Sequence, residues 1–140
     1  MDRPRAKDAA VRARMQRQRR SGTAPEMALR IALWRPGLRY RTNVAIIGRR
    51  RKADIVFTKA KVAVFVDGCF WHCCPDHGTV PLNNREWWQA KLAANVQRDR
   101  DTDLALHDAG WLVTRVWEHE DPIAAARRVR LAVEARRGPL

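Results

Sequence analysis

The chain has 140 residues, a length typical of one domain, and its 28 Lys and Arg against 15 Asp and Glu give a formal net charge of +13 at pH 7. This charge points first to nucleic acid, while 46% hydrophobic residues exclude wholesale disorder, and no uncharged apolar run reaches the roughly 20 residues of a membrane span. Three cysteines, two of them adjacent, argue against a secreted disulfide framework and favour a reducing compartment.

The first 20 residues carry eight basic side chains and almost no large apolar ones. We expect residues 1–20 to form a basic arm that becomes ordered on a phosphate backbone, with Arg14 and Arg17 among its DNA contacts. The alternative is a solvated helix or a tail without a partner. Residues 21–140 are expected to form one folded domain, because no linker or internal repeat divides them.

The folded part begins with a helix followed by strands. Thr23 and Glu26 have the spacing of a capping box, with Thr23 as the N-cap. The helix is expected to run through Met27, Ile31 and Trp34 and to end at residues 36–37. Apolar, β-branched runs then predict strands over 40–47, 53–57 and 61–66.

A long helix, a strand and a last helix complete the chain. Asn83 or Asn84 is expected to cap the long helix, and Gly110 to end it. A strand is predicted over 111–117, and Asp121, followed by proline, is the N-cap of the last helix. The order of elements predicts an α/β fold in which helices flank one mixed β-sheet.

Three carboxylates stand where they could hold a cation. Asp54 lies in an apolar strand, where an unpaired buried carboxylate is costly, and Asp67 ends the next apolar strand. Two adjacent strands with such carboxylates can hold Mg²⁺, with phosphate oxygens completing its coordination shell. Glu26 could add a third oxygen ligand. The alternatives are a capping role for Glu26 and a turn role for Asp67, which precedes a glycine.

A second group of residues has the chemistry of a zinc site. Cys69, Cys74 and His77 have the spacing C-x4-C-x2-H, and His119 follows a distant strand. Four thiolate and imidazole ligands suit tetrahedral Zn²⁺ in a structural site without an open position. Cys73 could replace Cys74, and the alternative reading is buried thiols with a surface histidine.

Aromatic and polar residues suited to DNA accompany these groups. Phe70 and Trp71 either cover the core or stack on bases, and His72 could accept a proton from an attacking water. Of the adjacent Trp87 and Trp88, one is expected to pack inward and the other to face outward. A polar face suited to phosphates, or merely solvated, follows at helical spacing: Lys91, Asn95 and Arg98.

Together these motifs resemble one family. The run FVDGCFWH over 65–72, Trp88, Lys91, the NVQRD segment over 95–99 and the segments over 110–111 and 116–118 resemble the very short patch repair mismatch endonucleases. The basic arm and the segment over 23–26 extend the similarity over nearly the whole chain. The resemblance implies a restriction-endonuclease-like fold that nicks DNA beside the thymine of a T·G mismatch, which is left when 5-methylcytosine deaminates.

The resemblance also implies residue roles. Asp54 and the backbone carbonyl of Val66 would hold the catalytic Mg²⁺, His72 would act as the base, and Glu26 would support the site. Phe70, Trp71 and Trp88 would wedge into the duplex. A structural Zn²⁺ would be held by Cys69, Cys74, His77 and His119.

The chain departs from the family at Asp67. Some members carry Thr-His where this chain has Val66 and Asp67, so Asp67 could alter metal binding or replace a helper histidine. Cys69 stands where restriction-type nucleases carry a lysine, which strengthens the case for His72 as the base.

The expected partner is double-stranded DNA with a T·G mismatch, with mismatch-repair proteins as further candidates. The protein is expected to act as a monomer in the cytoplasm, at the nucleoid, and away from membranes. Two alternatives are a restriction-type nuclease for another lesion or target and a non-catalytic zinc protein that binds DNA. Asp54 distinguishes the nucleases from the non-catalytic protein, because a protein that only binds DNA gains nothing from a carboxylate aimed at phosphate.

Overall fold

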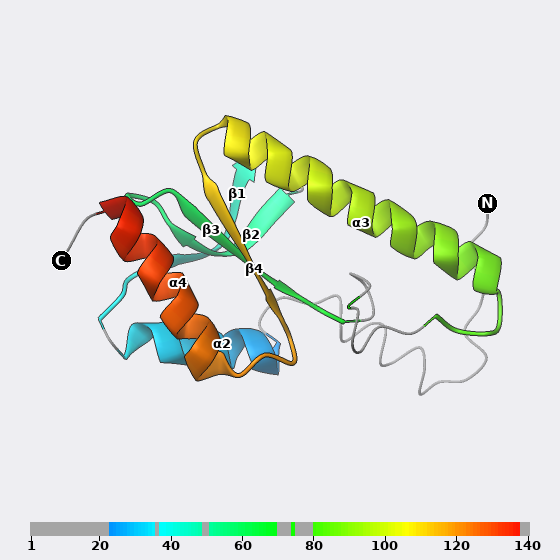
Figure 1. Ribbon diagram of the computed structural model, residues 1–140, viewed down its shortest axis with the longest axis horizontal. Helices are drawn as coiled ribbons and strands as arrows, with labels where there is room; N and C mark the ends of the chain where they lie inside the picture. Colours follow the sequence, from blue (N-terminus) through cyan, green and yellow to red (C-terminus); the bar gives the residue numbers. More distant parts are fainter. Residues whose placement is uncertain (1–22, 36, 49–50, 70–73, 75–79, 138–140) are drawn as a thin grey trace.

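The computed structural model describes residues 23–35, 37–48, 51–69, 74 and 80–137. These segments form a mixture of helices and strands (Figure 1). In chain order they are α2 (Ala24–Trp34), β1 (Arg41–Ile47), β2 (Arg51–Phe57), β3 (Val62–Asp67), α3 (Arg85–Asp108), β4 (Leu112–Trp117) and α4 (Pro122–Arg137). Within this described part, no helix combines the length and the apolar character needed to cross a membrane.

The four strands form one mixed sheet in the order β1-β2-β3-β4. β2 pairs antiparallel with both β1 and β3, whereas β3 and β4 run parallel, with Asp67 opposite Trp117. Parallel neighbours need a crossover connection, and α3 lies in the connection between β3 and β4. The predicted mixed sheet with flanking helices is therefore confirmed.

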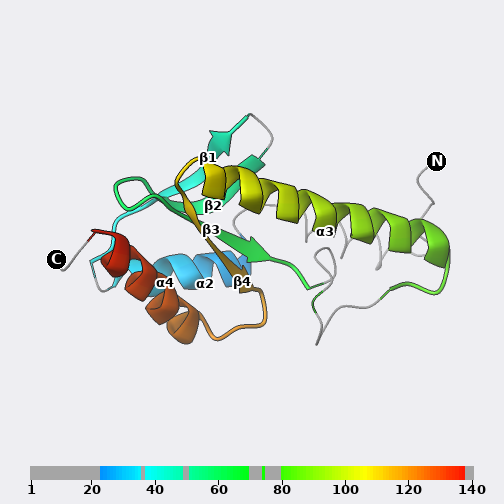
Figure 2. The same cartoon turned by 45° about the horizontal axis from the view of Figure 1, so that its top comes forward.

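Helices cover both faces of the sheet. α2 and α4 lie side by side against one face, and α3 crosses the other (Figures 1 and 2). Side chains of β3 alternate between these layers, as a period of two requires: Val62 and Val64 pack with Leu29, while Phe65 packs with Leu106. Only the C-terminal part of α3 covers the sheet, and its N-terminal part extends past the edge (Figure 1).

Met27, Ile31 and Trp34, through which α2 runs, do not form its buried face. Met27, Ile31 and Trp34 are 42%, 52% and 50% exposed, whereas Glu26 and Leu29 are buried. The expected capping box does not form either, since Thr23 is the N-cap but its side chain makes no capping hydrogen bond. The physical reason is that the carboxylate of Glu26 has partners inside the protein, so it turns inward with the leucines of its face.

The other helix ends match the prediction in part. Gly110 follows α3 with a φ of 87°, and the Oδ2 of Asp121 accepts a hydrogen bond from the backbone N–H of Ala124 at 3.0 Å. Asn84 precedes α3 but has a φ of 59° and makes no side-chain capping bond, so it does not cap in the expected way. An N-cap side chain usually reaches the first turn from extended backbone, which the left-handed conformation of Asn84 does not provide.

Candidate functional site

The central feature of the site is the attachment of Asp54 to β3. In the β2–β3 ladder Ile55 pairs with Val64. Beyond this pair, the Oδ2 of Asp54 accepts a hydrogen bond from the backbone N–H of Val66 at 2.7 Å. The side chain of Asp54 thus supplies the acceptor for Val66 next to the end of the backbone ladder. The two residues that were expected to share a metal ion, Asp54 and Val66, are neighbours in the structure.

Glu26 lies beside Asp54. Its side chain is buried, and Oε1 accepts a hydrogen bond from Nη2 of Arg30 at 3.1 Å. Burial raises the pKa of Asp54 to about 7, the hydrogen bond from Val66 opposes this shift, and the charge and hydrogen bond of Glu26 add to it. The structure therefore brings together two of the predicted carboxylates from distant parts of the chain.

This pair of carboxyl groups fits a divalent cation. Two neighbouring carboxylates repel each other when both are ionised, and the charge of Glu26 adds to the larger effect of desolvation in raising the pKa of Asp54. A hard cation bound by oxygen ligands would compensate both charges, and Mg²⁺ commonly binds through one or two carboxylates. The donor set at Glu26 and Asp54 is thus of the kind that Mg²⁺ uses.

Asp67 has a different environment. Its carboxylate is buried, and both of its oxygens accept hydrogen bonds from Nη1 of Arg115, at 3.0 and 3.1 Å. Its charge still contributes to the raised pKa of Asp54. Sequence reasoning missed Arg115, although the criterion that selected Asp54, a charged residue inside an apolar strand, applies equally to Arg115 in β4.

Three of the four predicted zinc ligands come together. The ligand atoms of Cys69, Cys74 and His119 all lie within 4.8 Å of one another, and Nδ1 of His119 is 3.3 Å from Sγ of Cys69 and 3.7 Å from Sγ of Cys74. Tetrahedral zinc with ordinary Zn–S and Zn–N bonds separates such ligand atoms by about 3.6 Å. The arrangement fits zinc, and of the two adjacent cysteines it contains Cys74.

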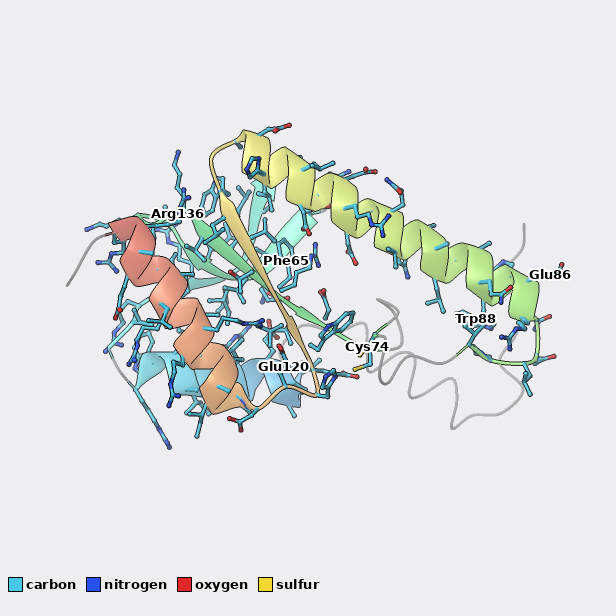
Figure 3. The ribbon with its side chains drawn as sticks, in the orientation of Figure 1. Phe65, Cys74, Glu86, Trp88, Glu120 and Arg136 are labelled. Atoms are coloured by element: carbon cyan, nitrogen blue, oxygen red, sulfur yellow. The ribbon has the colours of Figure 1, made fainter. Side chains whose placement is uncertain are left out.

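Hydrogen bonds from the backbone N–H groups of both cysteines hold this cluster in place. The N–H of Cys74 donates to the carbonyl of Cys69 at 3.0 Å, and the N–H of Cys69 donates to Oε1 of Glu118 at 3.1 Å. Figure 3 shows Cys74 beside the segment that follows β4. Burial, together with the hydrogen bond to Cys74 and the charge of Glu118, raises the pKa of Cys69 to about 12. Metal binding would displace a thiol proton here.

The tryptophans at the start of α3 form a small apolar cluster. Trp88 is 6% exposed and packs with Leu92 and Val80, and the ring of Trp87 meets it edge-on at 4.9 Å. Trp88 packs inward as one of the pair was expected to, while Trp87 is also partly buried. A wedge role for Trp88 requires its ring to leave this cluster, and it stays a prediction.

The polar face of α3 stays a prediction. Arg98 is exposed, and Lys91 and Asn95 are half-buried. The remaining predicted residues lie outside the described part of the chain, and their roles stay predictions: Arg14, Arg17, Phe70, Trp71, His72, Cys73 and His77.

Comparisons with known proteins agree with this geometry. A family model described as DNA mismatch endonuclease Vsr matches residues 6–76. The type II nicking enzyme V.NaeI of Lentzea aerocolonigenes is 56% identical over 110 residues, which are 76% of this chain and 66% of that protein. V.NmeDIP of Neisseria meningitidis serogroup C, also named a type II nicking enzyme, is 42% identical over 130 residues, 89% of this chain and 86% of its own.

A relative named for mismatch cleavage is more distant. The DNA mismatch endonuclease Vsr of Escherichia coli strain K12 is 36% identical over 100 residues, which are 69% of this chain and 61% of that protein. The family match covers half of the chain, and the similarity to V.NmeDIP covers most of both proteins. This chain belongs to the Vsr family of DNA endonucleases.

Proposed function

We propose that this protein nicks DNA beside the thymine of a T·G mismatch by Mg²⁺-dependent hydrolysis of a phosphodiester. The observation that carries the proposal is the pairing of the buried Glu26 with the half-buried Asp54, which is hydrogen-bonded to β3, in a member of a DNA endonuclease family. The mixed sheet with this acid pair also supports a restriction-endonuclease-like fold.

The residues of the site would divide the chemistry between them. Asp54, Glu26 and the carbonyl of Val66 would hold Mg²⁺, which supplies positive charge to the phosphate and lowers the pKa of a bound water. The hydrogen bond from Val66 orients the carboxylate of Asp54 before any ligand arrives. His72 would accept the proton of the attacking water.

Recognition would use the segment between the two cysteines. Cys69 and Cys74 flank residues 70–73, so a zinc ion on both thiols ties the two ends of the stretch that contains Phe70, Trp71 and His72. Stacking side chains gain most at a base step that a mismatch has already weakened. The arm over 1–20 and the exposed Arg98 would contact phosphates with little regard to sequence.

A second candidate is nicking at another DNA target. The relatives named type II nicking enzymes favour it, because their names state the reaction without a mismatch. A non-catalytic zinc protein that binds DNA is the weaker alternative, since the acid pair of Glu26 and Asp54 has no use in binding a polyanion.

Strand-specific nicking assays separate these candidates. The substrates are duplexes identical except at one position, which is T·G, C·G, T·A or an abasic site, with each strand labelled separately. We expect Mg²⁺-dependent nicking of the thymine strand of the T·G duplex and no nicking after Asp54→Asn. The asparagine keeps a side-chain oxygen that can accept the hydrogen bond from Val66. Equal nicking of the C·G duplex would contradict mismatch selection, and nicking by Asp54→Asn would remove the catalytic assignment.

A further inference from the structure

Arg115 joins three parts of the molecule beside the proposed metal site. From β4 its guanidinium reaches Asp67 at the end of β3 through Nη1, at 3.0 and 3.1 Å. Its Nε and Nη2 bind the carboxylate of Asp103 on α3, with Nη2 at 2.7 Å from Oδ1. Asp99, also on α3, lies 3.7 Å from Nη1. One cation thus faces three carboxylates.

The guanidinium is held firmly in this position. Its Cζ lies 4.4 Å from the centre of the Phe65 ring, the residue that Figure 3 labels on the sheet beneath α3. The side chains of Arg115 and Asp67 are 21% and 7% exposed. Burial by itself would lower the pKa of Arg115, but the hydrogen bonds to Asp103 and the surrounding carboxylates raise it above its ordinary value. Arg115 therefore remains charged.

Asp67 is next in sequence to a residue of the proposed metal site. It follows Val66, whose N–H binds Asp54, and its charge is felt at Asp54. A carboxylate in this position could enter the coordination shell of a cation and change the number and geometry of its ligands. Its two oxygens are instead both bonded to Arg115. Charge-assisted hydrogen bonds of this kind are among the stronger polar contacts in proteins.

We propose that Arg115 is a positioning residue that keeps Asp67 out of the coordination shell of the divalent ion at Asp54. The ligand set then consists of Glu26, Asp54 and the carbonyl of Val66. This assignment rests on the proposed metal site and adds to it the residue that decides which carboxylates can bind the ion.

Binding of Mn²⁺, followed by electron paramagnetic resonance on the DNA-free, zinc-loaded protein, tests the proposal without any nicking. Asp54→Asn should weaken Mn²⁺ binding about tenfold or more, as loss of a ligand does. Asp67→Asn should weaken it no more than Asp103→Asn, which removes the same charge from the same cluster. If Asp67→Asn weakens binding as strongly as Asp54→Asn, then Asp67 is itself a ligand and the proposal is overturned.

Removal of the arginine gives the converse result. Arg115→Met should remove the two hydrogen bonds that Arg115 makes to Asp67 and tighten Mn²⁺ binding, by about tenfold for one added carboxylate ligand. The tightening should persist in Arg115→Met with Asp103→Asn, which restores the net charge, and disappear in Arg115→Met with Asp67→Asn. If the two double variants bind Mn²⁺ equally, Arg115 acts through its charge alone and the proposal fails. Arg130→Met on α4 is the control for loss of an arginine in an ion pair.

The two proposals fail in different ways. Thermal melting shows whether each variant is folded, and if Arg115→Met does not fold, the comparison of Asp67→Asn with Asp103→Asn decides by itself. If Asp54→Asn leaves Mn²⁺ binding unchanged, the metal site is wrong, and the role of Arg115 is overturned with it. If Asp54→Asn weakens binding but Asp67→Asn does so equally, only the assignment of Arg115 is lost.

Discussion

The Sγ of Cys69 lies 3.3 Å from Nδ1 of His119, although fifty residues separate the two along the chain. The parallel pairing of β3 with β4 brings them together, because Cys69 follows the end of β3 and His119 follows the end of β4. Parallel strands end at the same edge of a sheet, so a metal ion there would join the connection after β3 to the segment after β4.

Zinc content is the first prediction. The purified protein should contain one zinc ion per chain, and His119→Ala should lower both the zinc content and the melting temperature, because metal binding contributes to folding. Elemental analysis and thermal melting measure the two effects. His107→Ala is the matched control, since His107 is a surface histidine at the end of α3. Full zinc retention in a combined Cys74→Ala, His119→Ala variant would disprove this ligand set.

Stability of the Mg²⁺-free protein should fall as the pH rises from about 4 to 7. The pKa of Asp54 is about 7 in the folded protein and near 3.8 in the unfolded chain, so folding retains a proton that the unfolded state releases. The stabilising contribution is complete below pH 3.8 and is lost as the pH approaches 7. The loss is on the order of a few kcal/mol, since one pKa unit corresponds to about 1.4 kcal/mol.

Urea denaturation of zinc-loaded protein at several pH values measures this slope. Asp54→Asn does not titrate and should show a smaller decline than the unaltered protein, while both share the effects of the other charges. Mg²⁺ should restore stability near pH 7 in the unaltered protein only. Parallel pH profiles for the two proteins would show that Asp54 does not carry the shift.

His72 should contribute to the chemical step and not to metal binding. His72→Ala should slow nicking by roughly 10²–10⁴-fold, the usual value of a general base, and remove the acid limb of the pH–rate profile. Single-turnover nicking and zinc analysis of the same preparation measure both properties. Loss of zinc together with activity would place His72 among the zinc ligands and leave Asp67 as the next candidate base.

Recognition should divide between the aromatic residues and the arm. Phe70→Ala or Trp71→Ala should reduce the preference for a T·G duplex over paired DNA by about 1–3 kcal/mol for each lost stacking contact. Deletion of residues 1–20 should weaken binding to all duplexes and reduce its salt dependence, because it removes phosphate contacts. Binding titrations at two salt concentrations separate the effects, and equal changes in mismatch preference would refute this division.

Features that depend on neighbouring residues could be predicted from the sequence alone. The proline after Asp121 and the glycine at 110 mark helix ends through local backbone chemistry, and both were found where expected. The apolar runs of β2 and β3 predicted buried strands because hydrophobicity acts at each position, and a charged residue within such a run singled out Asp54.

Contacts between side chains that are distant in the sequence depend on the tertiary fold. Glu26 reads as a helix cap in its own segment, yet it interacts with Asp54 because α2 packs through Leu29 and Leu33 against the sheet. Asp67 reads as a turn residue, yet it binds Arg115 because the parallel register places β4 beside β3. The energy of a buried charge depends on its partners, which can lie far away along the chain. The local sequence does not show which residues those partners are.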